Sequence, residues 1–242
     1  MAKYKYEESG IEWVDYKPIH WKIKRVKDIF NDEGGNGFPV ELQGNEDGEF
    51  PFLKASDINH AGETVTIGVN YVNEPLVKEM RWKIIPKNSI LTAKIGEAMK
   101  KNHRKINTVD CLIDNNLMAL IIRNEWECDI RYFNWLFKDI DFAEFEKPGT
   151  VPSLNMKVFR HFKILVPPRD EQTQIANYLD KVCADIDLII NLKVGKIKFD
   201  DNESDSEVNM LRKYKSALIN ETVTGRKQVY GLSEEKQQMQ SV

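Results

Sequence analysis

Cysteine and histidine are scarce in this sequence, and neither is arranged for chemistry. Cys111, Cys128 and Cys183 are odd in number and lie far apart among 242 residues. That spacing fits neither a disulfide framework nor a zinc site, so we expect buried free thiols. The four histidines are equally scattered and show no metal-ligand spacing. The sequence therefore predicts no metal centre.

Motifs for catalysis are also absent. The Gly195-Lys196 pair has Ile190 where a phosphate loop needs its first glycine, which excludes an ATPase of that class. Arginine follows the pair Pro167-Pro168, where an amino-methyltransferase motif has an aromatic residue. Acid-x-lysine triplets occur only near the ends of the chain, which disfavours a metal-dependent nuclease core. We expect a non-catalytic protein with no cofactor of its own.

Long apolar runs are missing as well. No stretch approaches the roughly 20 apolar residues of a membrane-spanning helix, and the start "MAKYKYEESG" lacks the features of a secretory signal. The hydrophobic content of 41% is still enough for a sizeable core. We interpret the chain as a soluble, cytoplasmic protein that does not contact a membrane.

Charge is segregated along the chain although the net charge is only −3. The segment 81–105 carries eight lysines and arginines against one acid, Glu97. Further basic groups occur at 22–27 and 157–169, whereas acids collect in "FDDNESDSE" at 199–207. Such separation is typical of a surface that faces phosphates, and equally of ordinary solvated faces.

Two regions of different texture follow one another. Residues 1–168 contain short runs rich in β-branched and aromatic residues, such as "FPFLKASDI", "TVTIGVNYV" and "CLIDNNLMALII", which predict strands. One helix is expected at 129–147, where apolar residues recur at helical spacing. This first region is therefore α+β, with a mixed sheet covered by at least one helix.

The second region, 169–226, is predicted to be helical and to form a coiled coil. Its apolar residues follow a four-three-four-three spacing. They come after two prolines that favour a helix start and after Asp170 and Glu171, which suit the positive end of the helix. Either the helix breaks near 199–204 and a second one runs over about 205–224, ending at Gly225, or one helix continues throughout. The polar tail 227–242 is expected to be disordered. The predicted partner-facing helix positions are Ile175, Leu179, Val182, Ile186, Ile189, Leu211 and Leu218.

Four separated stretches, in the same order, resemble the specificity subunit of type I restriction-modification systems. They are "SGIEWVDYKPIHWKIKRVKDIF", "FPFLKASDI" followed by "ILTAKIG", "GTVPSLN" before "FKILVPPRDEQTQIANYLD", and "LRKYKSALINETVTGR". The resemblance covers about residues 9–229. It implies a target-recognition domain at 1–168 that binds a short half-site of double-stranded DNA, and a long helix that sets the spacing between half-sites.

The same resemblance implies partners. The helix would dock DNA methyltransferase subunits, and restriction subunits could join the complex. S-adenosylmethionine is expected in the partner methyltransferase and no cofactor in this chain. Family chains commonly hold two recognition domains and two long helices, whereas this sequence shows one of each, so it looks like a half-length form. Such a form could pair with a second copy through its helices, pair with a different half-subunit, or act as a truncated chain with one recognition domain. The rival hypothesis is an interaction protein whose helical dimerisation arm carries a domain that binds another protein or single-stranded nucleic acid, without a methyltransferase partner.

Candidate DNA-binding residues follow from motif position and chemistry. Lysine and arginine suit phosphates, whereas asparagine and histidine can present donor and acceptor pairs to base edges. Each asparagine or serine is equally a possible loop or helix cap. The predicted residues are Gly34, Gly35, Asn36, Lys54, Ser56, Lys94, Lys100, Lys101, Asn102, His103, Arg104, Lys105, Thr150, Ser153 and Asn155.

Overall fold

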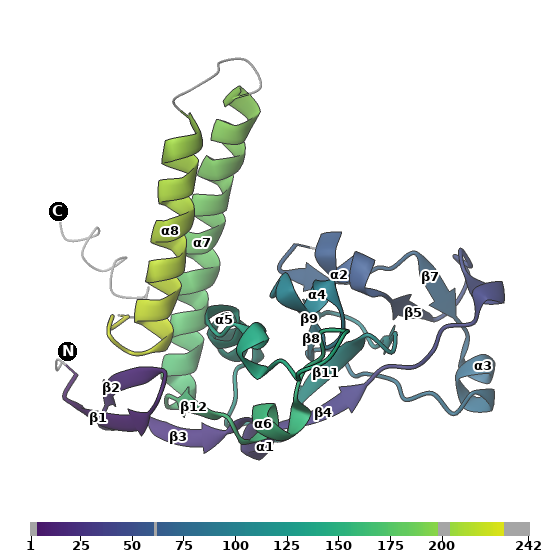
Figure 1. Ribbon diagram of the computed structural model, residues 1–242, viewed down its shortest axis with the longest axis horizontal. Coiled ribbons are helices and arrows are strands. Elements are labelled where there is room, and N and C mark those ends of the chain that lie inside the picture. Colours follow the sequence, from purple (N-terminus) through teal and green to yellow (C-terminus); the bar gives the residue numbers. More distant parts are fainter. Residues whose placement is uncertain (1–3, 61, 198–203, 230–242) are drawn as a thin grey trace, which may run out of the picture. The chain divides into compact units, whose positions relative to one another are not determined.

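The computed structural model describes residues 4–60, 62–197 and 204–229 (Figure 1). The chain divides into two compact units, one formed by Met1–Ile23 with Leu165–Val242 and the other by Lys24–Ile164. The strands β3 (Lys22–Arg25) and β12 (Lys163–Val166) pair in a two-stranded sheet. The boundaries between the two units fall inside these two strands. Residues 1–23, which were predicted to belong to the sheet region, group with the helices in the structure.

A five-stranded mixed sheet is the centre of the Lys24–Ile164 unit. Its strand order is β4-β11-β8-β9-β6, with β6 and β9 parallel and the other neighbours antiparallel. The central strands are almost fully buried, which explains their continuous apolar sequence. The mixed sheet confirms the α+β prediction. The strands are β4 (Phe30–Gly34), β11 (Leu117–Ile122), β8 (Ile90–Ala93), β9 (Arg104–Asn107) and β6 (Thr64–Val65).

The helix α5 (Ile130–Asp139) packs its aromatic face into this unit. Phe133 meets Phe30 of β4 edge to face, with ring centroids 5.2 Å apart. The predicted helix 129–147 ends early, because Ile140 is extended and the Asp141 side chain accepts from the Ala143 amide to start the 3-10 turn η2 (Phe142–Phe145). Phe142 then stacks against Phe159 of α6 (Met156–His161).

A smaller three-stranded sheet completes the same unit. Its order is β10-β5-β7, with β10 (Leu112–Ile113) parallel and β7 (Asn70–Val72) antiparallel to β5 (Phe50–Leu53). Its apolar core contains Phe52 and Leu112. The remaining short elements are α1 (Val26–Ile29), η1 (Val40–Leu42), α2 (Ala55–His60), α3 (Glu74–Glu79) and α4 (Glu97–Lys100).

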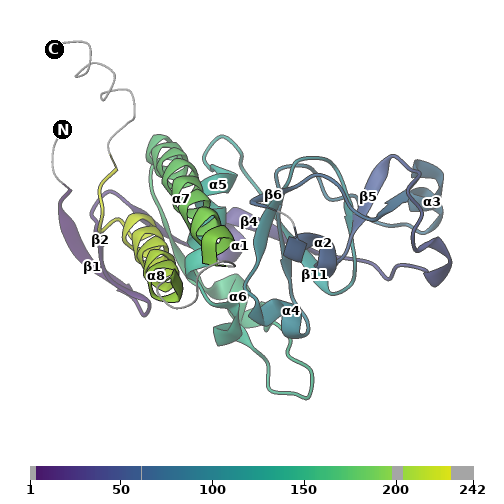
Figure 2. The ribbon, with the colours of Figure 1, turned by 90° about the horizontal axis from the view of Figure 1, so that it is seen from above.

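The other unit contains a helical hairpin. The helices α7 (Arg169–Ile197) and α8 (Ser204–Val223) lie side by side and antiparallel (Figures 1 and 2). Lys215 pairs with Asp187 at 2.6 Å, and Lys193 pairs with Glu207 nearer the ends that face the connection. Two helices are therefore present rather than one continuous helix, while residues 198–203 of the expected break lie outside the described residues.

Most of the apolar residues of α7 that were predicted to face a partner are covered by other residues of the same chain. Ile186 packs with Ile190 and with Val208 and Leu218 of α8. The prediction that Ile186 and Leu218 face a partner is therefore corrected, because α8 of the same chain covers them. Ile175 and Leu179 are also buried, and Val182 and Leu211 are partly buried against the Ile186 cluster, whereas Ile189 remains 43% exposed.

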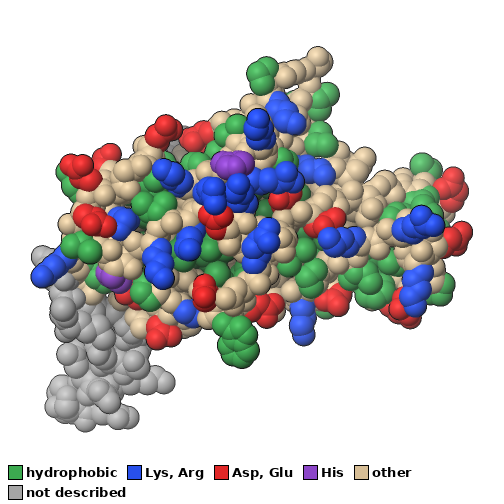
Figure 3. Space-filling view, turned by 90° about the horizontal axis from the view of Figure 1, so that it is seen from below, with side chains coloured by type: hydrophobic (Ala, Val, Ile, Leu, Met, Phe, Trp, Pro, Cys, Tyr) green, Lys and Arg blue, Asp and Glu red, His purple; other side chains and the backbone are tan. Residues whose placement is uncertain are grey.

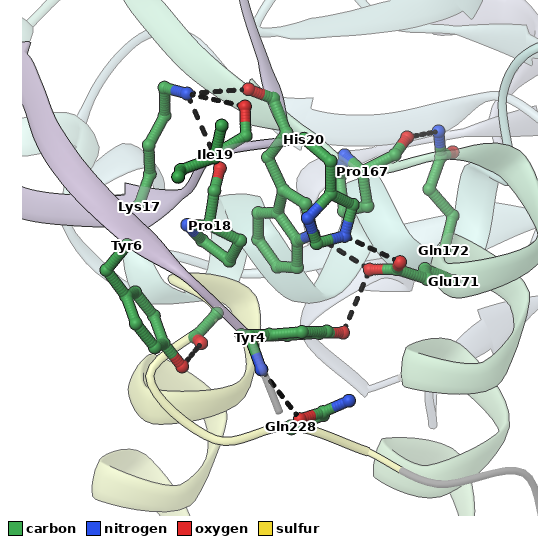
Figure 4. A network of polar contacts seen from close by, with 12 residues as sticks. Tyr4, Tyr6, Lys17, Pro18, Ile19, His20, Pro167, Glu171, Gln172 and Gln228 are labelled. Atoms are coloured by element: carbon green, nitrogen blue, oxygen red, sulfur yellow. Dashed lines mark hydrogen bonds and ion pairs between the residues drawn. The ribbon is translucent and has the colours of Figure 1, made fainter. Parts of the chain in front are cut away.

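One carboxylate joins the N-terminal segment to the start of α7. Glu171, in the first turn of α7, accepts from the Tyr4 hydroxyl at 2.9 Å and from Trp21 Nε1 at 2.8 Å, and its other oxygen lies 2.7 Å from His20 Nε2 (Figure 4). The Tyr6 hydroxyl donates to the Gly225 carbonyl just beyond α8. The residues that flank the hairpin of β1 (Tyr6–Ile11) and β2 (Val14–Pro18) thus contact the start of α7, and β1 itself contacts Gly225, just beyond α8, through Tyr6.

The three cysteines are free and buried, as predicted. Burial raises the pKa of the Cys111 thiol to about 12, which suppresses its reactivity. None of the helices in the described part of the chain is long and apolar enough to cross a bilayer.

Two glycines with left-handed backbone provide a matched test of this packing. Gly225 has φ +75°, and an added Cβ would lie 2.7 Å from the Pro18 ring, whereas Gly10 has φ +68° with open space around it. We expect Gly10→Ala to cost about 1–2 kcal/mol from backbone strain alone. Gly225→Ala should cost about 2–4 kcal/mol, because overpacking adds to the strain. Urea unfolding followed by helical circular dichroism measures both, and equal losses would contradict the packing role.

Candidate nucleic-acid interface

The glycine-containing loop after β4 is held by main-chain hydrogen bonds. The Gly35 amide donates to the Leu117 carbonyl at 3.3 Å and the Asn36 amide to the Ile113 carbonyl at 2.9 Å. A Cβ on Gly35 would lie 1.9 Å from the Asp114 carbonyl oxygen, so only glycine fits there. The predicted residues Gly34, Gly35 and Asn36 therefore sit against the turn that joins β10 to β11.

Two predicted lysines lie at the edge of the same turn. Lys94 follows β8, and its amide donates to the Asn116 carbonyl at 2.8 Å, while its ammonium lies over Gly34. Lys54 follows β5, with its ammonium 4.8 Å from the centre of the Phe38 ring. Lys54 at the end of a strand of the smaller sheet, and Lys94 and the Gly34–Asn36 loop at the ends of strands of the larger sheet, thus lie around the same turn.

A buried carboxyl lies beneath these lysines. Asp114 is 9% exposed and accepts a hydrogen bond from the Asn116 amide at 2.9 Å. Burial raises the pKa of Asp114, and the hydrogen bonds around Asn116 and the charge of Lys54 only partly offset this. Sequence analysis did not select Asp114 or Asn116, although "DNN" is a pattern typical of a turn.

The second predicted loop pairs with the segment after β8. Ile95 and Ser153 form an antiparallel bridge, the Gly96 amide donates to the Pro152 carbonyl at 2.8 Å, and the Leu154 amide donates to the Lys94 carbonyl at 2.9 Å. Ser153 therefore lies beside Lys94, with the exposed Thr150 nearby in the chain. The segments "AKIG" and "GTVPSLN" are therefore neighbours in the structure.

The helix α4 extends this surface with two exposed lysines. Lys100 forms an exposed ion pair with Glu97 at 3.2 Å, and Lys101 lies at the end of the helix. A solvated pair of this kind contributes about 0–1 kcal/mol, so Lys100 can exchange its partner for a phosphate at little cost. Ser56 is also exposed, in α2 after Lys54.

Arg104 is not on this surface, which corrects its predicted contact with phosphate. It is 1% exposed, its guanidinium stacks 3.5 Å from the centre of the Phe142 ring, and Nη2 donates to the Ile140 carbonyl. Burial lowers the pKa of Arg104 to about 9, with the charge of Asp141 acting in the opposite direction. Its position in β9, between buried layers, keeps it away from DNA.

Two of the predicted asparagines use their side chains for hydrogen bonds within the protein. Asn102, at φ +56°, donates to the Ile140 carbonyl at 3.2 Å and accepts from the Phe142 amide at 3.1 Å. Asn155 accepts from the Val158 amide as the N-cap of α6. Their side chains are therefore already used as caps and braces. His103 and Lys105 are partly buried, and burial followed by neighbouring cations lowers the pKa of His103.

No cluster of histidine, cysteine and acidic side chains able to hold a metal ion occurs among the described residues. What the described surface offers instead is loops held by main-chain bonds and edged with lysines. The chain combines an α+β unit with a helical hairpin, and this combination defines its class of fold.

The chain belongs to the family of type I restriction modification DNA specificity domains, whose pattern matches residues 18–196. The type I restriction enzyme MjaIX specificity subunit of Methanocaldococcus jannaschii is 28% identical over 189 residues, covering 74% of this chain. Those residues are 42% of that relative, so the chain spans less than half its length.

Two solved structures share the fold. The HsdS subunit from Thermoanaerobacter tengcongensis aligns with a TM-score of 0.57 and 16% identity, over 91% of this chain and 48% of that one. A chain from a study of complex assembly and conformational transition of the type I R-M system gives a TM-score of 0.60 and 16% identity, over 91% and 49%. They confirm the predicted combination of mixed sheets and long helices.

Replacing Asp114 tests its buried environment. A raised folded pKa means that the stability contributed by this carboxyl is full below its unfolded pKa, about 3.9, and is lost as pH rises through the folded pKa. Asp114→Asn should therefore raise the melting temperature at pH 7, and the gain should shrink towards pH 4. The exposed Asp47→Asn is the control. A gain that is equal at both pH values would contradict the assignment.

Proposed function

We propose that this chain is a sequence-specific DNA-binding specificity subunit of a type I restriction-modification complex. The observation that carries the proposal is the convergence of the Gly34–Asn36 loop, the 149–155 loop and Lys54, Lys94, Lys100 and Lys101 on one unit. Membership of the family of type I restriction modification DNA specificity domains supports DNA as the ligand, and we propose that this surface binds it as a double strand.

In this proposal the loops contact base edges and the lysines contact phosphates. Phosphate contacts fix the position of the protein on the duplex, and base contacts supply sequence discrimination. The chain itself carries out no catalysis. Methylation would be performed by partner methyltransferase subunits that hold S-adenosylmethionine, and cleavage by restriction subunits, docked on the helical unit.

Lys100 and Lys101 provide the test of the DNA-facing surface. Lys100→Ala/Lys101→Ala should weaken binding to all duplex sequences and flatten the plot of log affinity against log salt by about 0.9 for each lost phosphate contact. Fluorescence anisotropy at several salt concentrations measures the slope. Lys78→Ala/Lys213→Ala, at exposed lysines on α3 and α8, makes the same charge change as a control. An unchanged slope in the first variant would remove both lysines from the interface.

The helical unit is proposed to pair with a second copy of the chain. Leu188, Leu192, Met210 and Tyr214 are each more than half exposed, an unusual concentration of apolar surface on one hairpin. Beside them lies a groove of about 430 Å³ lined by Ile189, Lys193, Glu207, Met210, Leu211 and Tyr214. The exposed apolar residues of the hairpin and this groove are proposed to receive the partner helix, in place of the full set of apolar residues predicted from the sequence.

Charge substitution on this face tests the pairing. Leu192→Asp and Met210→Asp should turn the dimer into a monomer, because a desolvated carboxylate opposes association, while Met80→Asp on the sheet unit should not. Light scattering after size exclusion measures the mass.

A second readout is the methylated motif. Two identical copies related by a two-fold axis recognise an inverted repeat with a gap, which methylation sequencing of cells containing the chain and its methyltransferase would show. An asymmetric motif would contradict the homodimer, whatever the mass of the isolated chain.

A further inference from the structure

A second basic surface lies on α1 and α6, apart from the predicted DNA-binding residues. Residues 24–32 and 156–163 contain six lysines and arginines but only two acids, Asp28 and Asp32. Figure 3 views the molecule from the side on which α1 and α6 lie in Figure 1 and shows lysine and arginine side chains gathered around a histidine. We call this the α1–α6 surface, defined by Lys24, Lys27, Lys157, Arg160 and Lys163.

Two distant segments build the α1–α6 surface. The Val26 amide donates to the Phe162 carbonyl at 3.0 Å, which sets α1 beside the end of α6. Lys27 Nζ donates to His161 Nε2 at 2.7 Å, and His161 Nδ1 donates to the Lys157 carbonyl at 2.8 Å. The His161 ring thereby joins the Lys27 side chain to the main chain of α6.

The two acids near the α1–α6 surface are already occupied. Asp28 binds Arg25 through two hydrogen bonds of 2.9 Å, and Asp32 binds Arg160 through bonds of 2.7 and 2.6 Å. Arg25 holds the pKa of Asp28 near 2, so this carboxylate stays charged and paired. Among the described residues no carboxylate pairs with Lys27 or Lys157, which leaves their charges for an external anion.

The α1–α6 surface is continuous with the candidate interface along the chain. The helix α6 begins at the Asn155 cap, directly after the 149–155 loop, and Lys157 is exposed in its first turn. β4 connects α1 to the Gly34–Asn36 loop. Its five residues span about 17 Å at roughly 3.4 Å each. That length matches about five base pairs of duplex, whose strands carry one phosphate per 3.4 Å.

We propose that the α1–α6 surface binds the phosphate backbone of DNA that flanks the half-site. This inference rests on the proposed DNA-binding function and extends the contact beyond the loops that face the bases. The surface adds affinity without sequence preference, since lysines at phosphates carry no base information. It also gives the protein a footprint on the duplex longer than the half-site it recognises.

Duplex length separates this inference from the loop contacts. Two duplexes carry the motif found by methylation sequencing; one stops at the ends of the motif, and the other continues ten base pairs beyond each end. On the longer duplex, Lys27→Ala/Lys157→Ala should lower the salt slope by about 1.8. The change in Kd between 50 and 200 mM salt should then shrink about tenfold relative to the parent chain. On the shorter duplex the variant and the parent should have the same slope.

Controls keep the outcomes distinct. Lys78→Ala/Lys213→Ala makes the same change in net charge away from this surface and should leave both slopes unchanged. Lys157→Glu, at an exposed position, repeats the test without disturbing the Lys27–His161 contact. Equal salt slopes for Lys27→Ala/Lys157→Ala and the parent chain on the longer duplex would overturn the inference. It would also be overturned if this variant kept its DNA binding but no longer co-purified with the methyltransferase. If the parent chain binds neither duplex, the proposed function itself fails.

Discussion

The Glu171 carboxylate is the contact on which the helical unit depends. Three side chains from residues 4–21 converge on it at 2.7–2.9 Å, and it stands in the first turn of α7, where a negative charge also meets the positive end of the helix. The same N-terminal segment reaches the end of α8 through Tyr6 and Gly225. The start of α7 and the turn after α8 are thereby tied to the β1–β2 hairpin and the residues that flank it, which come from the other end of the chain.

Burial decides which cations of the sheet unit can meet a phosphate. Arg104 and Lys101 are three residues apart, yet one is stacked on Phe142 inside the protein and the other is exposed. A buried guanidinium braces the layer between β9 and η2, whereas solvated lysines keep a charge that can release counterions from DNA. The basic character of a segment is therefore a property of its exposed members only.

Local patterns predicted the elements better than the contacts between them. The Pro167-Pro168 pair and the periodic apolar residues placed the start of α7 at Arg169, and Gly225 marked the end of α8. The β1–β2 hairpin was missed because "YEESGI" is polar, and only Ser9 of its six residues is buried. Ile189 and Ile190 are equally apolar, and only the position of α8 decides that Ile190 is the buried one. The asparagines 102 and 155 likewise fit either base contact or capping until their main-chain neighbours are known.

Main-chain hydrogen bonds fix the shape of the loops in the candidate interface. The side chains on these loops can therefore differ without changing that shape. The amides of Gly35, Asn36 and Gly96 and the carbonyls of Lys94, Ile113 and Pro152 make the contacts that fix the two loops. Apart from glycine at position 35, where a Cβ would clash, and at position 96, where φ is +76°, these contacts place no demand on side-chain identity. Exposed positions on the loops can consequently change while the loops stay in place. Under the proposed function, exchanging a few side chains on this unchanged frame would alter the DNA target while the helical unit is retained.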